Sequence, residues 1–230
     1  MNDRSQRIAQ IVKNLPPFDL KRADIAGRNT FFSYAFNYIR YNNITGDYAE
    51  FGCASAKTFR LVSNYIRQIK LPMKQWAFDS FMGLPAQEGD KDFHPRWIEG
   101  DFAMSLEMFE AVVAAHGVER SAFEAVPGYY YDTIGPKAQK RPPSLPDDIA
   151  LAYVDCDLYS STSDVLFFLK PRLKTGMIIA FDDYFCYADG VKSGERLAML
   201  EFLKENPEWE FVPYQNIFSL GMSFIVEKRD

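Results

Sequence analysis

The sequence predicts an α/β protein built on a doubly wound, mainly parallel sheet of seven strands in a Rossmann-like arrangement. From residue 46 onward, short apolar runs alternate with segments of helical spacing, which is typical of repeated βα units. The last two apolar runs are separated by only a few residues, so they can pair antiparallel. The strands are expected at 48–52, 75–78, 123–126, 152–154, 177–181, 209–213 and 219–226.

The segments between these strands carry the apolar spacing of amphipathic helices. A helix is expected over 55–69, because its residues Phe59, Val62 and Ile66 recur every three or four positions. Further helices are expected over 105–116, 162–169 and 194–205. Residues 82–104 are rich in glycine, proline and charge, and they predict a long loop. A loop of this length inside a compact domain usually has a function.

The N-terminal segment lies outside the alternating pattern. Residues 1–28 are polar and contain two adjacent prolines, which predicts a short helix or irregular structure. Asn29 or Thr30 can cap a helix that ends near residue 41. This aromatic-rich helix is a candidate face for a homo-oligomer.

Composition narrows the classes of function. The 230 residues fit one domain over 46–230, preceded by a helical extension or lid over 1–45. The net charge is −5 and basic residues are scattered, so no nucleic-acid partner is expected. No apolar stretch approaches the ~20 residues of a bilayer span, and the polar N-terminus does not resemble a signal peptide, so no membrane partner is expected. Three cysteines without a C-x-x-C pair are expected to be free thiols of a cytoplasmic protein.

Two acidic clusters follow the fourth and fifth expected strands. Asp155 and Asp157 close one apolar run, and Asp182 and Asp183 close the next. Adjacent parallel strands joined by a helix bring their C-terminal ends to the same edge of the sheet, so these carboxylates are expected to crowd together. Crowded carboxylates repel one another unless a cation lies among them, and oxygen ligands favour Mg²⁺. The clusters therefore predict a metal site, and with it an enzyme.

The first two strands end in residues suited to a nucleotide-like ligand. The small residues after Glu50, among them Gly52 and Ser55, let a ligand approach the backbone at the start of the next helix. Asp79 follows Glu50 by 29 positions, which fits one βαβ unit. A carboxylate there can accept both hydroxyls of a ribose, with a surface acid as the alternative. The three-glycine G-x-G-x-x-G fingerprint is absent from the sequence, so this prediction depends on the Glu50–Asp79 pair.

Five short strings occur in one order along the chain. They are E-F-G at 50–52, D-S-F-M-G-L-P at 79–85, G-Y-Y-Y-D-T at 128–133, D-C-D-L-Y-S-S-T at 155–162 and D-D-Y at 182–184. Over residues 46–228 these strings together resemble the macrocin O-methyltransferase family, the metal-dependent sugar O-methyltransferases of macrolide and aminocoumarin pathways. The resemblance implies a class I methyltransferase fold. It also implies an enzyme that uses S-adenosylmethionine and Mg²⁺ to methylate a hydroxyl of a sugar or glycosylated metabolite.

The resemblance further implies roles for individual residues. Those that would bind or surround S-adenosylmethionine are Glu50, Gly52, Ser55, Asp79, Ser80, Phe81, Ser105 and Asp132. Asp155, Asp182 and Asp183 would be the metal ligands. Asp157 would be the general base that accepts the proton of the acceptor hydroxyl.

Several alternatives stay open at the level of sequence. Asp157 can cap the following helix instead of acting as a base. The D-C-D string also matches the D-x-D of a metal-dependent glycosyltransferase, and the fold can serve as a cofactor-binding module without turnover. Cys156 stands where the family pattern has glycine, and the 85–99 loop, with His94 and Trp97, matches no part of that pattern. The identity of the acceptor is not encoded in these motifs.

Overall fold

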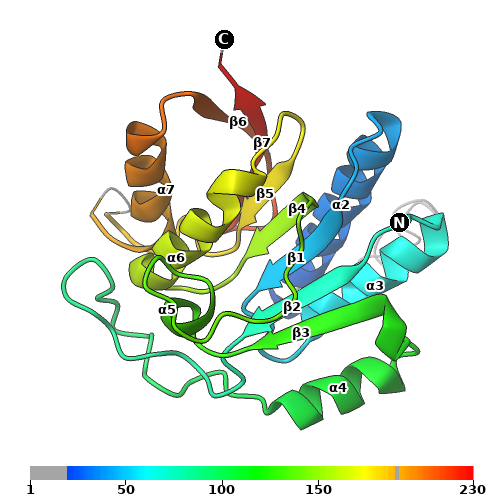
Figure 1. The fold of residues 1–230 in the computed structure, drawn as a ribbon, viewed down its shortest axis with the longest axis horizontal. Coiled ribbons are helices and arrows are strands. Elements are labelled where there is room, and N and C mark those ends of the chain that lie inside the picture. Colours follow the sequence, from blue (N-terminus) through cyan, green and yellow to red (C-terminus); the bar gives the residue numbers. More distant parts are fainter. Residues whose placement is uncertain (1–19, 190–191, 230) are drawn as a thin grey trace, which may run out of the picture.

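A computed structural model describes residues 20–189 and 192–229 of the chain. The strands are β1 (Asp47–Phe51), β2 (Gln75–Asp79), β3 (Phe123–Pro127), β4 (Ile149–Val154), β5 (Ile178–Phe181), β6 (Trp209–Asn216) and β7 (Met222–Lys228). They form one sheet in the order β3-β2-β1-β4-β5-β7-β6 (Figure 1). β1 to β5 are parallel, and β7 is antiparallel to both β5 and β6. The expected seven-stranded, mainly parallel sheet with an antiparallel closing pair is confirmed.

Helices cover both faces of the sheet. They are α2 (Leu20–Tyr41), α3 (Lys57–Ile69), α4 (Leu106–Ala115), α5 (Tyr130–Thr133), α6 (Tyr159–Leu169) and α7 (Gly194–Glu205). Helices α2, α3 and α4 pack on one face through Phe32, Phe59 and Phe109. Helices α5, α6 and α7 pack on the other face, where Leu166 and Phe202 are buried. Figure 1 shows these two helical layers on opposite sides of the sheet. The one-turn helix α5 was not expected from the sequence.

The strand order changes direction between β1 and β4, and this position determines where a ligand can bind. In doubly wound sheets a crevice opens at such a point, beyond the carboxyl ends of the strands. Phe51 of β1 pairs with Val154 of β4, and Val154 pairs with Phe181 of β5. The three strands therefore end at the same level, and the residues that follow them meet at one edge. β4 lies at the centre of the sheet and is buried along its whole length, as its apolar sequence predicts.

Helix α2 extends further toward the N-terminus than expected. Asn29 and Thr30 lie inside the helix, because the Thr30 hydroxyl donates to the Ala26 carbonyl one turn earlier, at 2.9 Å. Asp24 and Arg28 form an ion pair of 2.5 Å across the preceding turn, and such a pair supports a helix. The expected cap at position 29 or 30 is therefore wrong. Of the two alternatives for residues 1–28, the described part from Leu20 is helical and not irregular. The first 19 residues of the expected extension lie outside the described residues.

The long loop between β2 and α4, residues 80–105, is held in place by Asp92. This side chain is fully buried. Its Oδ1 accepts from the Ser160 amide at 2.8 Å, and its Oδ2 accepts from the Ser160 hydroxyl at 2.7 Å and from the Glu88 amide at 2.8 Å. Asp92 thus supplies from a distant loop the carboxylate that caps α6. The loop also reaches α7, where the Gly194 amide donates to the Lys91 carbonyl at 2.9 Å.

Two further expectations concern membrane-spanning helices and the state of the cysteines. Within residues 20–189 and 192–229, no helix combines the length and the apolar character needed to cross a bilayer. The three cysteines are free, as expected, with Cys53 and Cys156 buried and Cys186 partly exposed. The buried thiols fill space close to the sheet edge, and burial raises the pKa of both well above the ordinary value.

Candidate active site

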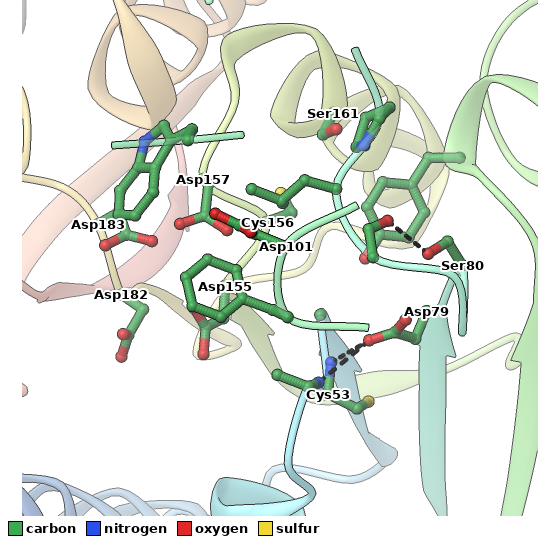
Figure 2. A pocket seen from close by; sticks show the side chains of 18 of the residues that line it. Cys53, Asp79, Ser80, Asp101, Asp155, Cys156, Asp157, Ser161, Asp182 and Asp183 are labelled. Carbon is green, nitrogen blue, oxygen red and sulfur yellow. Dashed lines mark hydrogen bonds between the residues drawn. The ribbon is translucent and has the colours of Figure 1, made fainter. Parts of the chain in front are cut away.

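A pocket opens at the C-terminal edge of the sheet, where β1, β2, β4 and β5 end (Figure 2). Residues from α2, from α6 and from the 80–105 loop complete its walls. The structure brings together in this pocket most of the side chains singled out from the sequence. They are Glu50, Gly52, Ser55, Asp79, Ser80, Asp155, Asp157, Asp182 and Asp183.

The three carboxylates expected to bind a metal converge at one end of the pocket. Asp155, Asp182 and Asp183 each offer an oxygen, and these oxygens all lie within 4.8 Å of one another. Asp182 and Asp183 are buried, and Asp155 is partly exposed toward the pocket. β4 and β5 are paired neighbours that end at the same level, so the turns after them place these side chains together. A donor set of carboxylate oxygens suits a hard divalent cation such as Mg²⁺.

Burial and mutual repulsion shift the pKa values of several carboxyl groups at this end of the pocket. Burial, and after it the charges of Asp182 and Asp183, raise the pKa of Asp155 well above its ordinary value. Burial raises the pKa of Asp182 to about 6, although Arg28 opposes this shift. Burial and the charge of Asp183 likewise raise the pKa of Asp157. Each shift means that the group of carboxylates is destabilised when fully ionised, and a bound cation would relieve that repulsion.

Arg28 of α2 supplies a cation to this group, and the sequence reasoning missed it. Its guanidinium hydrogen bonds and ion-pairs with the Asp182 carboxylate, pairs with Asp24 at 2.5 Å, and donates to the Tyr153 hydroxyl at 3.2 Å. The Tyr153 hydroxyl in turn donates to Asp182. Burial opposes the charged form of Arg28, but Tyr153, Asp182 and Asp155 outweigh it and raise its pKa. Asp182 is therefore oriented by two donors, as ligands of metal sites usually are.

Glu195, in the first turn of α7, is a second residue that sequence reasoning missed. It is fully buried, and its two oxygens accept from backbone amides of the two acidic turns. Oε1 accepts from Cys156 at 3.2 Å and Oε2 from Asp183 at 3.0 Å. Burial and then the charges of Asp183 and Asp157 raise the pKa of Glu195 well above its ordinary value. This carboxyl group holds the turn after β4 at a set distance from the turn after β5.

Asp157 lies in a tight turn between β4 and α6. Its φ of +63° is in the left-handed region, and the Leu158 amide donates to the Cys156 carbonyl at 2.6 Å. The N-cap of α6 is Leu158, with no side-chain cap bond of its own, and Asp92 bonds the first-turn amide of Ser160 instead. In the described structure the capping role that competed for Asp157 is thus performed by Asp92. The Asp157 carboxyl remains on the pocket wall, beside Asp183.

The other end of the pocket is built from the turns after β1 and β2. Asp79 Oδ2 accepts from the amides of Cys53 at 2.6 Å and Ala54 at 3.2 Å, and its Oδ1 accepts from the Phe81 amide at 2.7 Å. Figure 2 shows Asp79 reaching across to the backbone at Cys53. Gly52 has a φ of +92°, and a Cβ there would lie 1.8 Å from the Asp155 carbonyl oxygen. Only glycine allows the turns after β1 and β4 to approach so closely.

Glu50, the last acid of β1, is 1% exposed. Its Oε2 accepts from the Tyr48 hydroxyl at 2.6 Å. Burial raises its pKa to about 8, which the Tyr48 hydrogen bond opposes and Asp182 and Asp79 reinforce. A neutral or partly ionised carboxyl at this place can hydrogen bond a polar ligand without adding a full charge to the acidic end.

Three side chains expected near the cofactor do not line the pocket among the described residues. Phe81 is buried in the core with a φ of +56°. The Ser105 side chain caps α4 by accepting from the Met108 amide. Asp132 lies on α5 and forms a 2.7 Å ion pair with Lys140. Three tyrosines at the start of α5 line the pocket in their place: Tyr129, Tyr130 and Tyr131.

The long loop contributes aromatic residues to the opposite wall. Trp97 and Phe102 line the pocket, whereas His94 packs behind Trp97 with ring centroids 4.8 Å apart. The sequence indicated a functional loop through its length, but no local pattern identified which of its side chains would face the site.

Comparisons with known proteins identify relatives of this chain. The model of the macrocin-O-methyltransferase (TylF) family matches residues 26–205. The 8-demethyl-8-(2,3-dimethoxy-alpha-L-rhamnosyl)-tetracenomycin-C 4'-O-methyltransferase of Streptomyces olivaceus is 31% identical over 115 residues, or 47% of this chain and 41% of that protein. The demethyldecarbamoylnovobiocin O-methyltransferase of Streptomyces niveus is 30% identical over 156 residues, or 62% of this chain and 54% of that protein. The chain thus spans about half the length of the curated relatives it matches.

The fold is also similar to that of a solved structure, the O-methyltransferase NovP. The TM-score is 0.67 at 22% sequence identity, with 86% of this chain and 79% of that chain covered. The family match begins within α2 and ends with α7, so it includes Arg28 and Glu195 as well as the strand-end acids. None of these relatives favours the glycosyltransferase interpretation of the D-C-D string.

Proposed function

The chain belongs to the macrocin-O-methyltransferase (TylF) family, and from that premise we propose that it transfers the methyl group of S-adenosylmethionine to a hydroxyl of a sugar or glycoside, with Mg²⁺ bound at the acidic end of the pocket. The observation that carries this proposal is the convergence of three carboxylate oxygens within 4.8 Å of one another. They lie in the same pocket as Glu50, Gly52 and Asp79. One pocket can therefore hold a cofactor at one end and a metal with an acceptor at the other.

The donor set fits the metal. Asp155, Asp182 and Asp183 would hold Mg²⁺, since their oxygens are close together. Burial, and after it the charges of neighbouring carboxylates, raise the pKa of Asp155 and Asp182, and a bound cation would oppose both effects. When bound, S-adenosylmethionine supplies an electrophilic methyl on a positive sulfur, and Mg²⁺ supplies Lewis-acid polarisation of the acceptor hydroxyl. The chain's own contribution is to orient the acceptor, exclude water and receive a proton.

Asp157 is proposed as the group that receives the proton. Its carboxyl is 8% exposed, lies on the pocket wall next to the ligand Asp183, and is not used as the cap of α6. Burial and Asp183 raise its pKa, which increases its affinity for the proton of the acceptor hydroxyl. The Tyr187 hydroxyl donates to the Asp157 carbonyl at 3.4 Å and steadies this turn.

The cofactor end is proposed to bind the ribose and methionine parts of S-adenosylmethionine. Asp79 has three of its acceptor positions occupied by backbone amides, which orients the carboxylate and leaves room for a ribose hydroxyl. Gly52 and Ser55 are small, so they leave space for a ligand where the chain passes from β1 into α3. The stacked pair Tyr129 and Tyr131, with centroids 5.4 Å apart, offers an aromatic surface further along the pocket.

The acceptor class is proposed from the relatives. By their names, the first relative is a 4'-O-methyltransferase of a rhamnosyl-tetracenomycin, and the second is an O-methyltransferase of demethyldecarbamoylnovobiocin. A hydroxyl of a sugar or glycoside is the kind of group that a carboxylate-bound Mg²⁺ would activate.

Asp155→Asn tests the metal most cleanly, because no hydrogen bond to this side chain is found among the described residues. We expect this variant to bind S-adenosylhomocysteine as the parent protein does, in calorimetry, and to lose Mn²⁺ binding measured by electron paramagnetic resonance. We expect no methyl transfer to a panel of rhamnosides by this variant, and none by the parent protein when EDTA is added. The control is Asp189→Asn, which changes an exposed acid of the neighbouring loop that pairs with Lys192 at 2.9 Å. Full activity of the parent protein in EDTA would contradict the proposal.

Asp157→Asn tests the proposed role of Asp157 as a base separately from metal binding by the other aspartates. We expect it to retain Mn²⁺ and S-adenosylhomocysteine and to lower the single-turnover rate by about 10²–10⁴-fold. An unchanged rate would return Asp157 to a structural role.

A further inference from the structure

Two aromatic side chains of the 80–105 loop form an apolar surface inside the pocket that holds the acidic cluster. We call Trp97 and Phe102 the aromatic wall. Both line the pocket, and their ring centroids lie 6.2 Å apart at an interplanar angle of 66°. Phe102 is 56% exposed although it is a large apolar residue. Exposed apolar surface in a pocket that also holds a few polar groups is typical of a ligand site.

The aromatic wall is supported by residues that reach the proposed base. Trp97 stacks on His94 at 4.8 Å, and His94 packs edge-on against Tyr187 at 4.9 Å. The Tyr187 hydroxyl donates to the carbonyls of Asp92 at 3.1 Å and Asp157 at 3.4 Å. Trp97 is therefore connected to the acidic end of the pocket. Phe102 packs against Trp97 from the side of the turn after β2, where the Leu84 amide donates to the Asp101 carbonyl at 3.0 Å. In the view of Figure 2, the loop segment that carries Asp101, the residue before Phe102, is drawn between Asp157 and Asp79.

The backbone at Phe102 is strained. Its φ is +61°, in the left-handed region, which is an outlier for a bulky side chain and costs on the order of 1 kcal/mol. Burial in the core does not offset this cost, because the ring faces the pocket and is more than half exposed. Strain of this kind concentrates at binding sites, where it presents a side chain to a ligand.

The charges around the pocket restrict what the wall can bind. Among the described residues that line it, ten are acidic and only Arg28 and Lys57 are basic. Arg28 is already paired with Asp24 and Asp182. Within the described residues, a phosphate group at the acidic end of the pocket would lie among carboxyl groups and find no unpaired basic side chain. A neutral ligand avoids this repulsion.

We propose that the aromatic wall binds the C–H face of a neutral glycosyl unit, whose hydroxyls then point to the carboxylates, and that the acceptor is a glycoside and not a nucleoside-diphosphate sugar. A pyranose ring has an apolar face of C–H groups and a polar rim of hydroxyls, which matches an aromatic surface beside an acidic one. The inference rests on the proposed function and narrows its acceptor to one class of compound, glycosides. Trp97 and Phe102 are specificity-determining residues on this account, because they contact the acceptor and not the reacting atoms.

The loop offers a matched control. Phe93 is 66% exposed and lies in the same loop, but it is not among the described residues that line the pocket. Phe93→Ala removes as much exposed aromatic surface as Phe102→Ala does, at a place where no acceptor is expected.

The test compares two probes that carry the same sugar, methyl α-L-rhamnopyranoside and TDP-L-rhamnose. Binding to the full chain with Mg²⁺ and S-adenosylhomocysteine is followed by saturation-transfer difference NMR. We expect the rhamnoside to bind more tightly than TDP-rhamnose, with the strongest transfer to the ring C–H protons. Phe102→Ala and Trp97→Ala should each weaken rhamnoside binding by about fivefold. Phe93→Ala should leave it unchanged, and all three variants should bind S-adenosylhomocysteine as the parent protein does.

Tighter binding of TDP-rhamnose, absence of rhamnoside binding, or unchanged rhamnoside affinity in Phe102→Ala would each overturn the proposal. Phe102→Ala is decisive if Trp97→Ala fails to fold, because the Phe102 ring is mostly exposed. The assay contains no methyl donor, so it is independent of turnover. A parent protein that binds the rhamnoside at the wall but does not methylate it with S-adenosylmethionine would refute the proposed function and leave the wall in place.

Discussion

Replacement of Asp92 by asparagine is expected to destabilise the protein and to loosen the 80–105 loop. Asp92 is fully buried, and its two oxygens accept three hydrogen bonds, two from backbone amides and one from the Ser160 hydroxyl. Asparagine keeps the shape of the side chain but has only one acceptor oxygen. Its NH₂ group must face the amide of either Glu88 or Ser160, and that amide loses its partner.

The magnitude follows from these contacts. A buried donor left without an acceptor costs about 1–3 kcal/mol. The carboxylate also lies at the N-terminus of α6, where loss of a negative charge costs about 0.3–1 kcal/mol. We therefore expect the free energy of unfolding to fall by about 1–4 kcal/mol. For a chain of this size, that corresponds to a fall in Tm of about 3–16 °C.

Urea unfolding followed by circular dichroism measures the loss, and limited proteolysis measures the loop. Asp90→Asn is the matched control, because Asp90 is an exposed acid two positions earlier in the same loop. We expect cleavage within 80–105 to be faster in Asp92→Asn than in the control. Equal unfolding free energies for Asp92→Asn and Asp90→Asn would refute the idea that Asp92 is the cap of α6.

Two further predictions concern buried carboxyl groups near the site. Glu195→Gln should lower the free energy of unfolding by about 1–3 kcal/mol, because one of the amides of Cys156 and Asp183 loses its acceptor. Glu195→Gln should also weaken Mn²⁺ binding and leave S-adenosylhomocysteine binding unchanged. The control Glu205→Gln, at the exposed end of α7, should change neither the stability nor Mn²⁺ binding. Unchanged Mn²⁺ affinity in Glu195→Gln would contradict the idea that Glu195 fixes the spacing of the two acidic turns. The folded-state pKa of Glu50 is raised from 4.5 to about 8, so the folded protein binds its proton more tightly than the unfolded chain does. The parent protein should therefore lose stability relative to Glu50→Gln as the pH rises from about 5 to 8, and parallel stability–pH curves for the two proteins would contradict this.

Much of the fold was predictable because its signals are local. The apolar run of β4 and the helical spacing of α3 each lie within a single element. Both elements end where they were expected, whereas β4 begins three residues earlier and α3 two residues later than predicted. The predicted start of α2 failed for a physical reason. Asn and Thr favour helix N-caps, but the Thr30 hydroxyl can also bond a carbonyl one turn back inside a helix, and only the packing of the segment decides between these roles.

The candidate site was predictable in part, through the residues at strand ends. Acids that directly follow parallel strands must meet at one edge, so Asp155, Asp182 and Asp183 could be placed together from their positions alone. Ser105 and Asp132 were expected near the cofactor by resemblance, and the structure places neither on the pocket wall among the described residues. Their roles there stay predictions.

The sequence by itself determined the sheet, its order of strands and helices, and the edge at which the acids gather, because these depend on short-range apolar periodicity and on the geometry of βα units. Only the tertiary structure decided how the acids are held. Arg28 reaches Asp182 across 154 positions of sequence, and Asp92 caps a helix 68 positions away. Glu195 joins turns that lie 39 and 12 positions before it. A single arginine, aspartate or glutamate has no local pattern that marks its partner, since its partner is set by how the helices and the long loop pack against the sheet.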